Sequence, residues 1–295
     1  MTSLPPAEAP KPSNTVLRLA SAAILIPATL LGLVLGGPVF LAMMGLGVYL
    51  LAREWCSMST PKGARRLAIV LTLGILAVAV AAYLHMTVLA WILVVVAAGL
   101  GALVAGMVGE RPGDAAYGVI YIAPAILALV WLRGLHHGLE WALMTFFITW
   151  AADSAAYAVG RIVQGPKLWT SLSPNKTWSG FMGGLVGGML PPVAMVFLFP
   201  VTLQLGPWPL VLSSTGMHWW GAALVGLFGA LATMVGDLWE SFLKRRFGVK
   251  DSGQLIPGHG GLLDRVDGLL FTVVVVAITR VAHDFGLTHL WGLSV

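Results

Sequence analysis

Long apolar runs constrain the fold of this 295-residue chain more than any other feature of its sequence. A helix needs about 20 apolar residues to cross the hydrocarbon core of a bilayer. Charged residues make up only 10% of the chain and hydrophobic residues 58%, whereas soluble domains carry roughly 25% charge. The sequence therefore predicts an all-α integral membrane protein, because helices satisfy their own backbone hydrogen bonds in lipid. We place nine transmembrane helices at residues 16–36, 38–53, 67–84, 87–108, 116–132, 139–160, 180–203, 219–243 and 265–284.

The second apolar run is short, and Gly36, Gly37 and Pro38 interrupt the chain just before it. The first two runs are therefore either two full spans or a re-entrant pair. Residues 1–15 are polar and rich in proline, which predicts a disordered cytoplasmic tail. The remaining chain divides into N-terminal transmembrane helices (16–135) and a C-terminal transmembrane region (136–295) with cytoplasmic loops at 161–179 and 244–264.

The basic residues are distributed unevenly between the two sides of the predicted bundle. Nine crossings place the N-terminus and the loops after the even-numbered helices on one side. All of the 17 Lys and Arg residues except Arg133 and Arg280 fall on that side. The positive-inside rule then predicts a cytoplasmic N-terminus and an external C-terminus. The net charge of +5 is explained by this topology, so we expect no nucleic-acid partner.

Three acidic residues lie inside predicted helices, where ionisable groups usually mark function. Asp153 lies in the sixth helix, and Asp237 and Glu240 lie three positions apart on one face of the eighth. All three are near the cytoplasmic ends of their helices. No Lys or Arg is found at this depth in the predicted helices. A metal ion or a water-filled cleft is therefore a better explanation than an ion pair or a hydrogen bond between helices.

The loop at 161–179 ends in Ser173-Pro174-Asn175-Lys176-Thr177 just before a predicted helix. Hydroxyl and amide donors, one positive charge and the N–H groups of a helix N-terminus suit a phosphate group. An N-capped turn is an equally good interpretation of this segment taken alone.

The polar run from Ser241 to Asp267 is chemically the richest part of the chain. With Glu240 just before it, it holds four carboxylates, five basic groups and a Gly-His-Gly-Gly turn. Cations and glycine N–H groups suit the phosphates of a nucleoside triphosphate, and carboxylate oxygens suit its Mg²⁺. A basic loop at the lipid headgroups would explain the cations, but not Asp264 and Asp267 at the start of the next helix.

This run has a specific pattern: Ser-x-Leu-Lys-Arg, four residues, Lys-Asp-x-Gly, and then Pro-Gly-His-Gly-Gly-x-x-Asp-Arg-x-Asp. At every fixed position, the run resembles the motif of the phosphatidate cytidylyltransferase (CDP-diacylglycerol synthase) family. Ser173–Thr177 and the segment from Asp153 to Arg161 are also similar to that family, whereas the N-terminal half resembles it only in hydropathy. One departure is Ser179, where the family usually has Glu, so one carboxylate is missing.

The resemblance implies transfer of CMP from CTP to phosphatidic acid, giving CDP-diacylglycerol and pyrophosphate for phospholipid biosynthesis. It makes residues 136–295 the catalytic region of a multi-pass protein of the cell inner membrane, with its active site facing the cytoplasm. Mg²⁺ or another divalent cation is implied, and a monovalent cation beside it is left open. We expect the metal to be held by Asp237, Asp264 and Asp267, with Lys250, Arg265 and His259 as the other catalytic groups. We expect the substrates to contact Ser173, Asn175, Lys176, Thr177, Lys244, Arg245, Asp153 and Glu240.

Gly180, Gly184 and Gly188 follow one face of the seventh predicted helix. This spacing indicates close packing between helices or a dimer seam, and the family resemblance favours a homodimer. Two other classes of function remain open. A related lipid-phosphate cytidylyltransferase or a lipid kinase would differ in the acceptor. A membrane transporter would predict an inverted internal repeat, which the sequence lacks.

Overall fold

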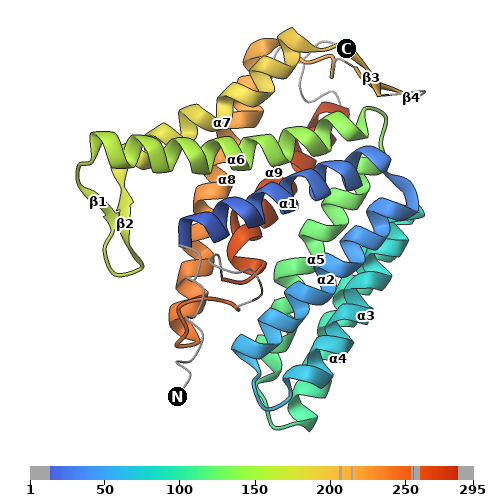
Figure 1. Ribbon diagram of the computed structural model, residues 1–295. Helices are drawn as coiled ribbons and strands as arrows, with labels where there is room; N and C mark the ends of the chain where they lie inside the picture. Colours follow the sequence, from blue (N-terminus) through green and yellow to red (C-terminus); the bar gives the residue numbers. More distant parts are fainter. Residues whose placement is uncertain (1–13, 206–207, 214, 254, 256–259, 285–295) are drawn as a thin grey trace, which may run out of the picture.

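The computed structural model describes residues 14–205, 208–213, 215–253, 255 and 260–284 (Figure 1). Most of the predicted tail, and His259, lie outside these residues. Within them, α2 to α9 are long and apolar enough to cross a membrane, and α1 contains the shorter apolar segment Ser21–Leu35. The predicted all-α membrane bundle is confirmed. The helices are α1 (Asn14–Leu35), α2 (Gly37–Ser59), α3 (Ala64–Tyr83), α4 (Thr87–Met107), α5 (Pro112–Gly134), α6 (Gly138–Val163), α7 (Trp178–Leu198), α8 (Trp219–Arg246) and α9 (Leu263–Asp284).

The break between the first two helices is set by two glycines. Gly36 and Gly37 have φ values of +62° and +50°, in the left-handed region that favours glycine. Pro38 follows in the first turn of α2, where its missing N–H costs no hydrogen bond. α2 then continues to Ser59, six residues beyond its predicted end. The second apolar run is therefore part of a helix that is long and apolar enough to cross a membrane.

In the part of the chain that the structure describes, two short hairpins interrupt the helical bundle. β1 (Lys167–Trp169) pairs with β2 (Ser173–Thr177), and β3 (Val201–Leu205) pairs with β4 (Trp208–Leu212), both antiparallel. The prediction that the seventh helix extends to residue 203 is wrong, because α7 ends at Leu198. Pro200 accounts for this end, since proline disfavours helical conformation in the residue before it.

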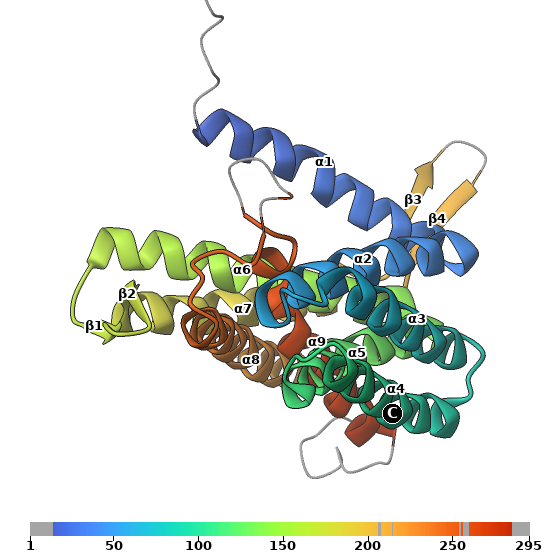
Figure 2. The same ribbon diagram turned by 90° about the horizontal axis from the view of Figure 1, so that it is seen from below.

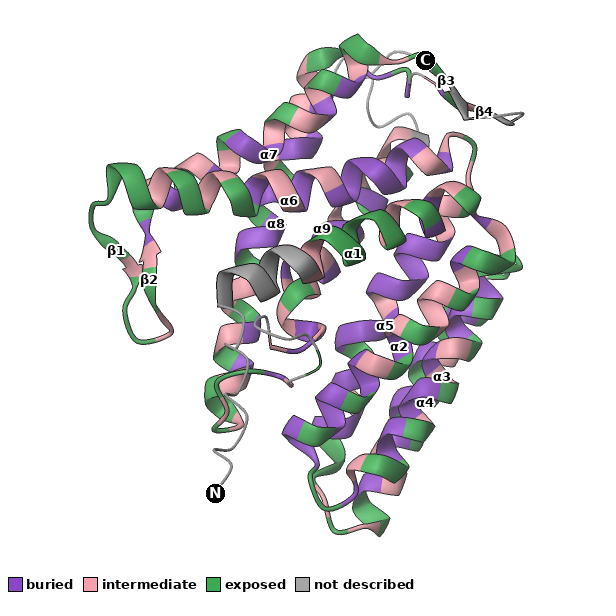
Figure 3. Ribbon diagram, viewed as in Figure 1, coloured by how far each residue is buried: buried purple, intermediate pink, exposed green. Residues whose placement is uncertain are grey.

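The helices form two groups that meet at α9. Figure 2 shows α2 to α5 on one side of α9 and α6, α7 and α8 on the other. In Figure 1, α6 and α7 run side by side across the molecule. α5 is largely buried between neighbours, whereas α3 and α4 have exposed outer faces (Figure 3). Exposed aliphatic side chains such as Leu73, Val88 and Val95 suit contact with lipid.

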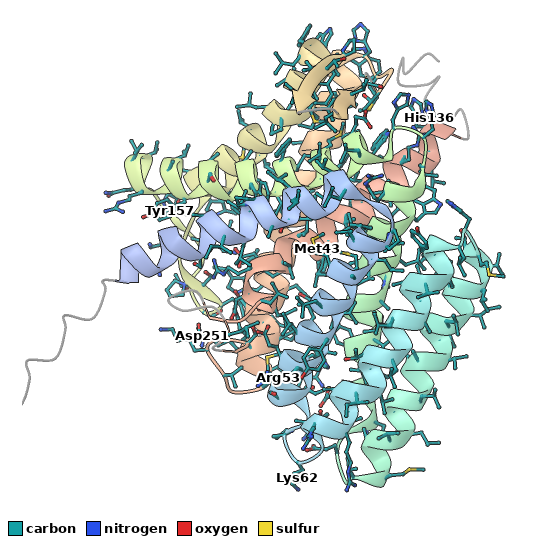
Figure 4. The ribbon with its side chains drawn as sticks, turned by 45° about the vertical axis from the view of Figure 1, so that its right-hand side comes forward. Met43, Arg53, Lys62, His136, Tyr157 and Asp251 are labelled. Carbon is teal, nitrogen blue, oxygen red and sulfur yellow. The ribbon has the colours of Figure 1, made fainter. Side chains whose placement is uncertain are left out.

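Two loops that the charge pattern assigns to different sides lie at opposite ends of the bundle. Lys62, between α2 and α3, and His136, between α5 and α6, lie at opposite ends (Figure 4). Arg133 lies near the His136 end, where its Nε donates to the Leu33 carbonyl at 2.7 Å. Its guanidinium also reaches the Val34 carbonyl at 3.4 Å. Arg133 therefore satisfies carbonyls at the C-terminus of α1, which lack partners within the helix.

The glycine stripe of α7 packs inside this chain. A Cβ atom added to Gly180 would lie 2.8 Å from the Ala156 carbonyl oxygen of α6. One added to Gly188 would lie 2.5 Å from Cβ of Ala230 of α8. The described structure thus favours close packing between helices over a dimer seam for this stripe.

Gly226→Ala should destabilise the contact between α7 and α8. The new Cβ would lie 2.6 Å from both the Gly188 carbonyl oxygen and the Met189 Cα. Because both are backbone atoms, we expect a cost of about 1–3 kcal/mol, typical of overpacking. Thermal unfolding in detergent should show a lower midpoint for this variant. The matched control is Gly99→Ala in α4, where a Cβ meets nothing within 4 Å; equal midpoints for the two variants would contradict the packing.

Candidate active site

A cluster of acidic side chains forms where α6, α8 and α9 meet. Asp267 of α9 lies within electrostatic range of Asp237 and Glu240 of α8 and of Asp153 of α6. Asp153 also interacts electrostatically with Asp237. The Glu240 side chain is only 1% exposed, whereas that of Asp237 is 36% exposed. The cluster therefore extends from an accessible part at Asp237 to a buried part at Glu240.

Small residues let α8 and α9 approach closely at this cluster. A Cβ on Gly236 would lie 2.6 Å from the Asp267 carbonyl oxygen, and one on Gly268 would lie 2.7 Å from Cγ2 of Thr233. The hydroxyls of Thr233 and Thr272 join the two helices with a buried hydrogen bond of 2.7 Å. This tight crossing brings Asp237 and Asp267 together although they are far apart in sequence.

The β1–β2 hairpin supplies a cation to the cluster. Lys176 in β2 forms an ion pair with Asp237. Arg265, which is exposed, lies within electrostatic range of Asp153, and Lys244 pairs with Glu240. The prediction that the intramembrane acids have no ion-pair partners is therefore wrong for Asp237 and Glu240. Lys176 reaches Asp237 from a hairpin whose path the sequence pattern does not reveal.

The other polar residues of β2 are arranged differently from Lys176. Side chains alternate along a strand, so Ser173, Asn175 and Thr177 lie on the face opposite Lys176. Thr177 Oγ1 accepts a hydrogen bond from Gly180 N at 3.1 Å and caps α7. The N-capped turn is thus present at Thr177. Contacts of Ser173 and Asn175 with substrate stay predictions.

Ser179 takes part in the same turn. Its hydroxyl donates to the Gln164 carbonyl and lies 3.0 Å from Thr177 Oγ1. The serine found at this position therefore joins the end of α6 to the start of α7, and no carboxylate is present there.

Asp264 and Lys244 connect α9 to α8 just beside the cluster. Lys244 Nζ lies 2.7 Å from Asp264 Oδ1 and 2.5 Å from Glu240 Oε2. Asp264 Oδ2 accepts hydrogen bonds from Ser252 N, Ser252 Oγ and Gly261 N, each at 2.9 Å. Asp264 is thus fully engaged by protein donors and holds the loop after α8. Its assignment as a metal ligand stays a prediction.

A residue outside the predicted site completes the start of α9. Glu54 of α2 accepts hydrogen bonds from Leu262 N and Leu263 N, both at 2.8 Å. The predicted second helix ends at residue 53, so Glu54 falls outside the predicted intramembrane acids. Because Asp264 and Glu54 occupy the N–H groups of residues 261–263, the expectation that the glycine-rich turn offers its N–H groups to phosphate fails at Gly261.

The N-terminal half makes further contacts with this region. Arg246, in the last turn of α8, forms an ion pair with Asp114 in the first turn of α5. Trp55 Nε1 donates to the Asp114 carbonyl at 3.0 Å. Trp239 Nε1 of α8 donates to the Tyr117 hydroxyl at 2.7 Å. Helices of the N-terminal half therefore support the polar end of α8.

The remaining predicted residues are exposed or lie outside the described part of the chain. Arg245 and Lys250 are exposed and form no ion pair with described residues. His259 lies outside the described residues. Within those residues, no three His, Cys, Asp or Glu side chains converge closely enough to form a metal site as they stand.

Comparison with known proteins identifies the family. The sequence model described as "Cytidylyltransferase family" matches residues 16–282. A phosphatidate cytidylyltransferase from Staphylococcus haemolyticus is 38% identical over 166 residues, which cover 56% of this chain and 58% of that protein. Proteins of the same name match from Brucella suis, at 41% identity over 54% of this chain and 53% of theirs, and from Staphylococcus aureus, at 42% over 48% and 49%.

The chain spans about half the length of the curated relatives it matches. The family model, in contrast, covers all nine described helices almost completely. The carboxylates, the hairpin lysine and the anchored loop after α8 all lie within the matched residues. On this match the protein belongs to the cytidylyltransferase family.

Proposed function

We propose that this protein transfers CMP from CTP to phosphatidic acid, giving CDP-diacylglycerol and pyrophosphate. The observation that carries the proposal is the acidic cluster of α6, α8 and α9, bordered by cations, in a member of the cytidylyltransferase family. The relatives named phosphatidate cytidylyltransferase support phosphatidic acid as the acceptor. The membrane bundle supports a lipid acceptor in general, since diacyl chains enter such a site from the bilayer.

The reaction requires charge neutralisation more than proton transfer. An anionic phosphate oxygen of phosphatidic acid attacks the α-phosphorus of CTP and forms the new P–O bond. The bond from that phosphorus to the oxygen bridging to the β-phosphate breaks, and pyrophosphate leaves with the electron pair. Both reactants are polyanions, so fixed positive charge is the main catalytic requirement.

The donor set of the cluster fits a divalent cation in chemistry and charge. Counted as ionised, its five carboxylates exceed its three cations by two charges; the members are Asp153, Asp237, Glu240, Asp264 and Asp267, with Lys176, Lys244 and Arg265. Carboxylate oxygens are the ligands that Mg²⁺ prefers. When bound, such a cation neutralises phosphate charge between the two substrates.

Asp237 and Asp267 are the members best placed to hold the cation. Asp267 Oδ1 accepts a hydrogen bond from Gly268 N at 2.7 Å, and its other oxygen receives none from the described part of the chain. Among the described residues, Asp237 pairs only with the flexible Lys176. Lys176 is then free to turn to a phosphate group once the cation takes its place. Asp264 would have to exchange its loop contacts before it served as a ligand.

The exposed cations supply the remaining positive charge. Arg265, Arg245 and Lys250 are accessible and neutralise the phosphates of CTP and of the lipid in this proposal. Lys244 differs, because its bonds to Glu240 and Asp264 make it part of the framework. His259, Ser173 and Asn175 remain proposed substrate contacts.

The test is incorporation of label from CTP, carrying ³²P in its α-phosphate, into chloroform-extractable lipid by the purified protein. We expect incorporation to require both phosphatidic acid and Mg²⁺. Chelation with EDTA should abolish it, and added Mg²⁺ should restore it, because the carboxylate cluster lacks enough fixed cations. Activity that persists in EDTA would contradict the metal proposal. Incorporation with another lipid phosphate in place of phosphatidic acid would identify a related transferase.

We also propose that the site faces the cytoplasm from the cell inner membrane, and that the protein forms a homodimer. The strong bias of Lys and Arg to one side supports the orientation. Inside-out membrane vesicles should then use added CTP without detergent. The glycine stripe of α7 is already used within one chain, so a dimer would use a different, lipid-facing surface.

A further inference from the structure

We propose that Glu54 is a positioning residue that holds the first turn of α9, and with it Asp264, Arg265 and Asp267, in register with α8. Its catalytic consequence rests on the function proposed above. Glu54 lies near the end of α2, is only 7% exposed, and is separated from Leu262 by 208 residues. The contact therefore joins the N-terminal half of the chain directly to the site.

The start of α9 requires hydrogen-bond acceptors that its own sequence does not provide. The first N–H groups of a helix have no partner within it. A Ser, Thr, Asp or Asn side chain usually caps them, but Leu262 and Leu263 have no side-chain acceptor. The Glu54 carboxylate accepts from both N–H groups, while Asp264 accepts from Gly261 N. Negative charge is also favourable at a helix N-terminus.

The same carboxylate accounts for two glycines of the loop. A Cβ on Gly253 would lie 3.0 Å from Glu54 Oε1, and one on Gly261 would lie 2.7 Å from Oε2 and still closer to Ser252 Oγ. Glu54 cannot move aside without losing its bonds to Leu262 and Leu263. A larger residue at either position would therefore press on the Glu54 carboxylate.

A chain of polar contacts links Glu54 to the cluster. Ser252 Oγ lies 3.5 Å from Glu54 Oε2 and donates to Asp264 Oδ2 at 2.9 Å. Asp264 then pairs with Lys244. Since Asp264 and Asp267 are three positions apart on α9, a shift of this turn moves Asp267 relative to Asp237. A displacement of about 1 Å in such a site can reduce the rate about 100-fold.

Hydrogen exchange measures this contact directly. A cavity of about 400 Å³ lined by Glu54, Ser57, Ser252 and Gly253, among others, borders the contact. Figure 4 shows Arg53 of α2 and Asp251 of the loop on neighbouring parts of this end of the molecule. Glu54→Gln places an amide N–H₂ group where a backbone N–H needs an acceptor. We expect faster amide exchange in peptides covering residues 260–263, with exchange in α7 unchanged.

The matched control is Glu140→Gln at the opposite end of the bundle. Glu140 is also buried, at 4% exposure, and accepts a backbone hydrogen bond, from Ser213 N at 2.7 Å. This variant should leave exchange at residues 260–263 and CMP transfer unchanged. The comparison separates loss of the Glu54 contact from loss of any buried carboxylate.

The kinetic expectation is a fall in kcat/KM for CTP of about tenfold or more in Glu54→Gln, as for residues that orient ligands without touching substrate. A double-mutant cycle provides a second test. Gly253→Ala should lower the thermal midpoint when Glu54 is present and have a smaller effect in Glu54→Ala, where the crowding atoms are gone.

Unchanged exchange at residues 260–263 in Glu54→Gln would overturn the proposal, as would equal opening of the loop in Glu140→Gln. Faster exchange with undiminished CMP transfer would overturn the positioning role. If the unaltered protein transfers CMP to no lipid phosphate, the proposed function fails, and the exchange and midpoint measurements still decide whether Glu54 anchors α9.

Discussion

Asp267→Asn should abolish CMP transfer while leaving the protein folded in the membrane. Asparagine preserves the shape of the side chain but removes the charge that the proposed cation requires. We expect the rate to fall at least about 100-fold, which corresponds to about 2.7 kcal/mol of transition-state stabilisation. Asp267 lies among Asp153, Asp237 and Glu240, so neutralising it relieves repulsion. The thermal midpoint in detergent, without added metal, should therefore stay the same or rise.

Glu110→Gln is the control for this exchange of a carboxylate for an amide. Glu110 accepts from Lys62 N at 2.6 Å in the turn between α4 and α5, away from the cluster. This variant should transfer CMP at the normal rate. Retained activity in Asp267→Asn would refute the assignment of Asp267 to the metal, and a lowered midpoint would mean that its charge stabilises the fold.

Asp264→Asn should lose both activity and stability. The Asp264 side chain is 5% exposed and that of Lys244 is 14% exposed, so their ion pair is largely buried. Removing one partner of a buried pair costs about 3 kcal/mol. The amide also presents N–H₂ to donors that include Ser252 N and Gly261 N. We expect CMP transfer to fall at least about 100-fold, a loss typical of removing one preorganised group that stabilises charge in the transition state. We also expect the thermal midpoint to drop.

The contrast between the two aspartates distinguishes their roles. Both lie in the first turns of α9, three positions apart, and both belong to the same sequence pattern. Activity and unfolding midpoint measured on the same preparations should separate them. If Asp264→Asn unfolds at the normal temperature, its contacts with Lys244 and the loop do not stabilise the protein as described above.

The number and order of the helices follow from the sequence, because each needs a long apolar segment in lipid. The ends of the helices do not, since polar residues continue a helix once it leaves the hydrocarbon core. α2 runs past its predicted end and α5 begins before its predicted start. Glu54 and Asp114 lie in these extensions, and both bind residues around the site. The sequence signal for both residues is an acidic side chain just beyond the end of an apolar run.

Loop geometry accounts for the other differences between the predicted site and the observed site. Asp153, Asp237 and Glu240 were recognisable as acids within predicted transmembrane helices, because charge is rare in such helices. Their partner Lys176 was recognisable only as a loop cation, since the β1–β2 hairpin that directs it to Asp237 has no apolar period. The commitment of Thr177 to capping α7 likewise depends on where that helix begins.

The bond between Glu54 and the start of α9 has a consequence for biogenesis. Ribosomes add about 5–20 residues per second, and Leu262 follows Glu54 by 208 residues. Glu54 is thus in the membrane for about 10–40 seconds before the N–H groups that donate to it exist. Throughout that interval, Glu54 must remain hydrated or be shielded by the insertion machinery. A nascent chain stalled before α9 would leave this acid without the two N–H groups that donate to it in the finished protein.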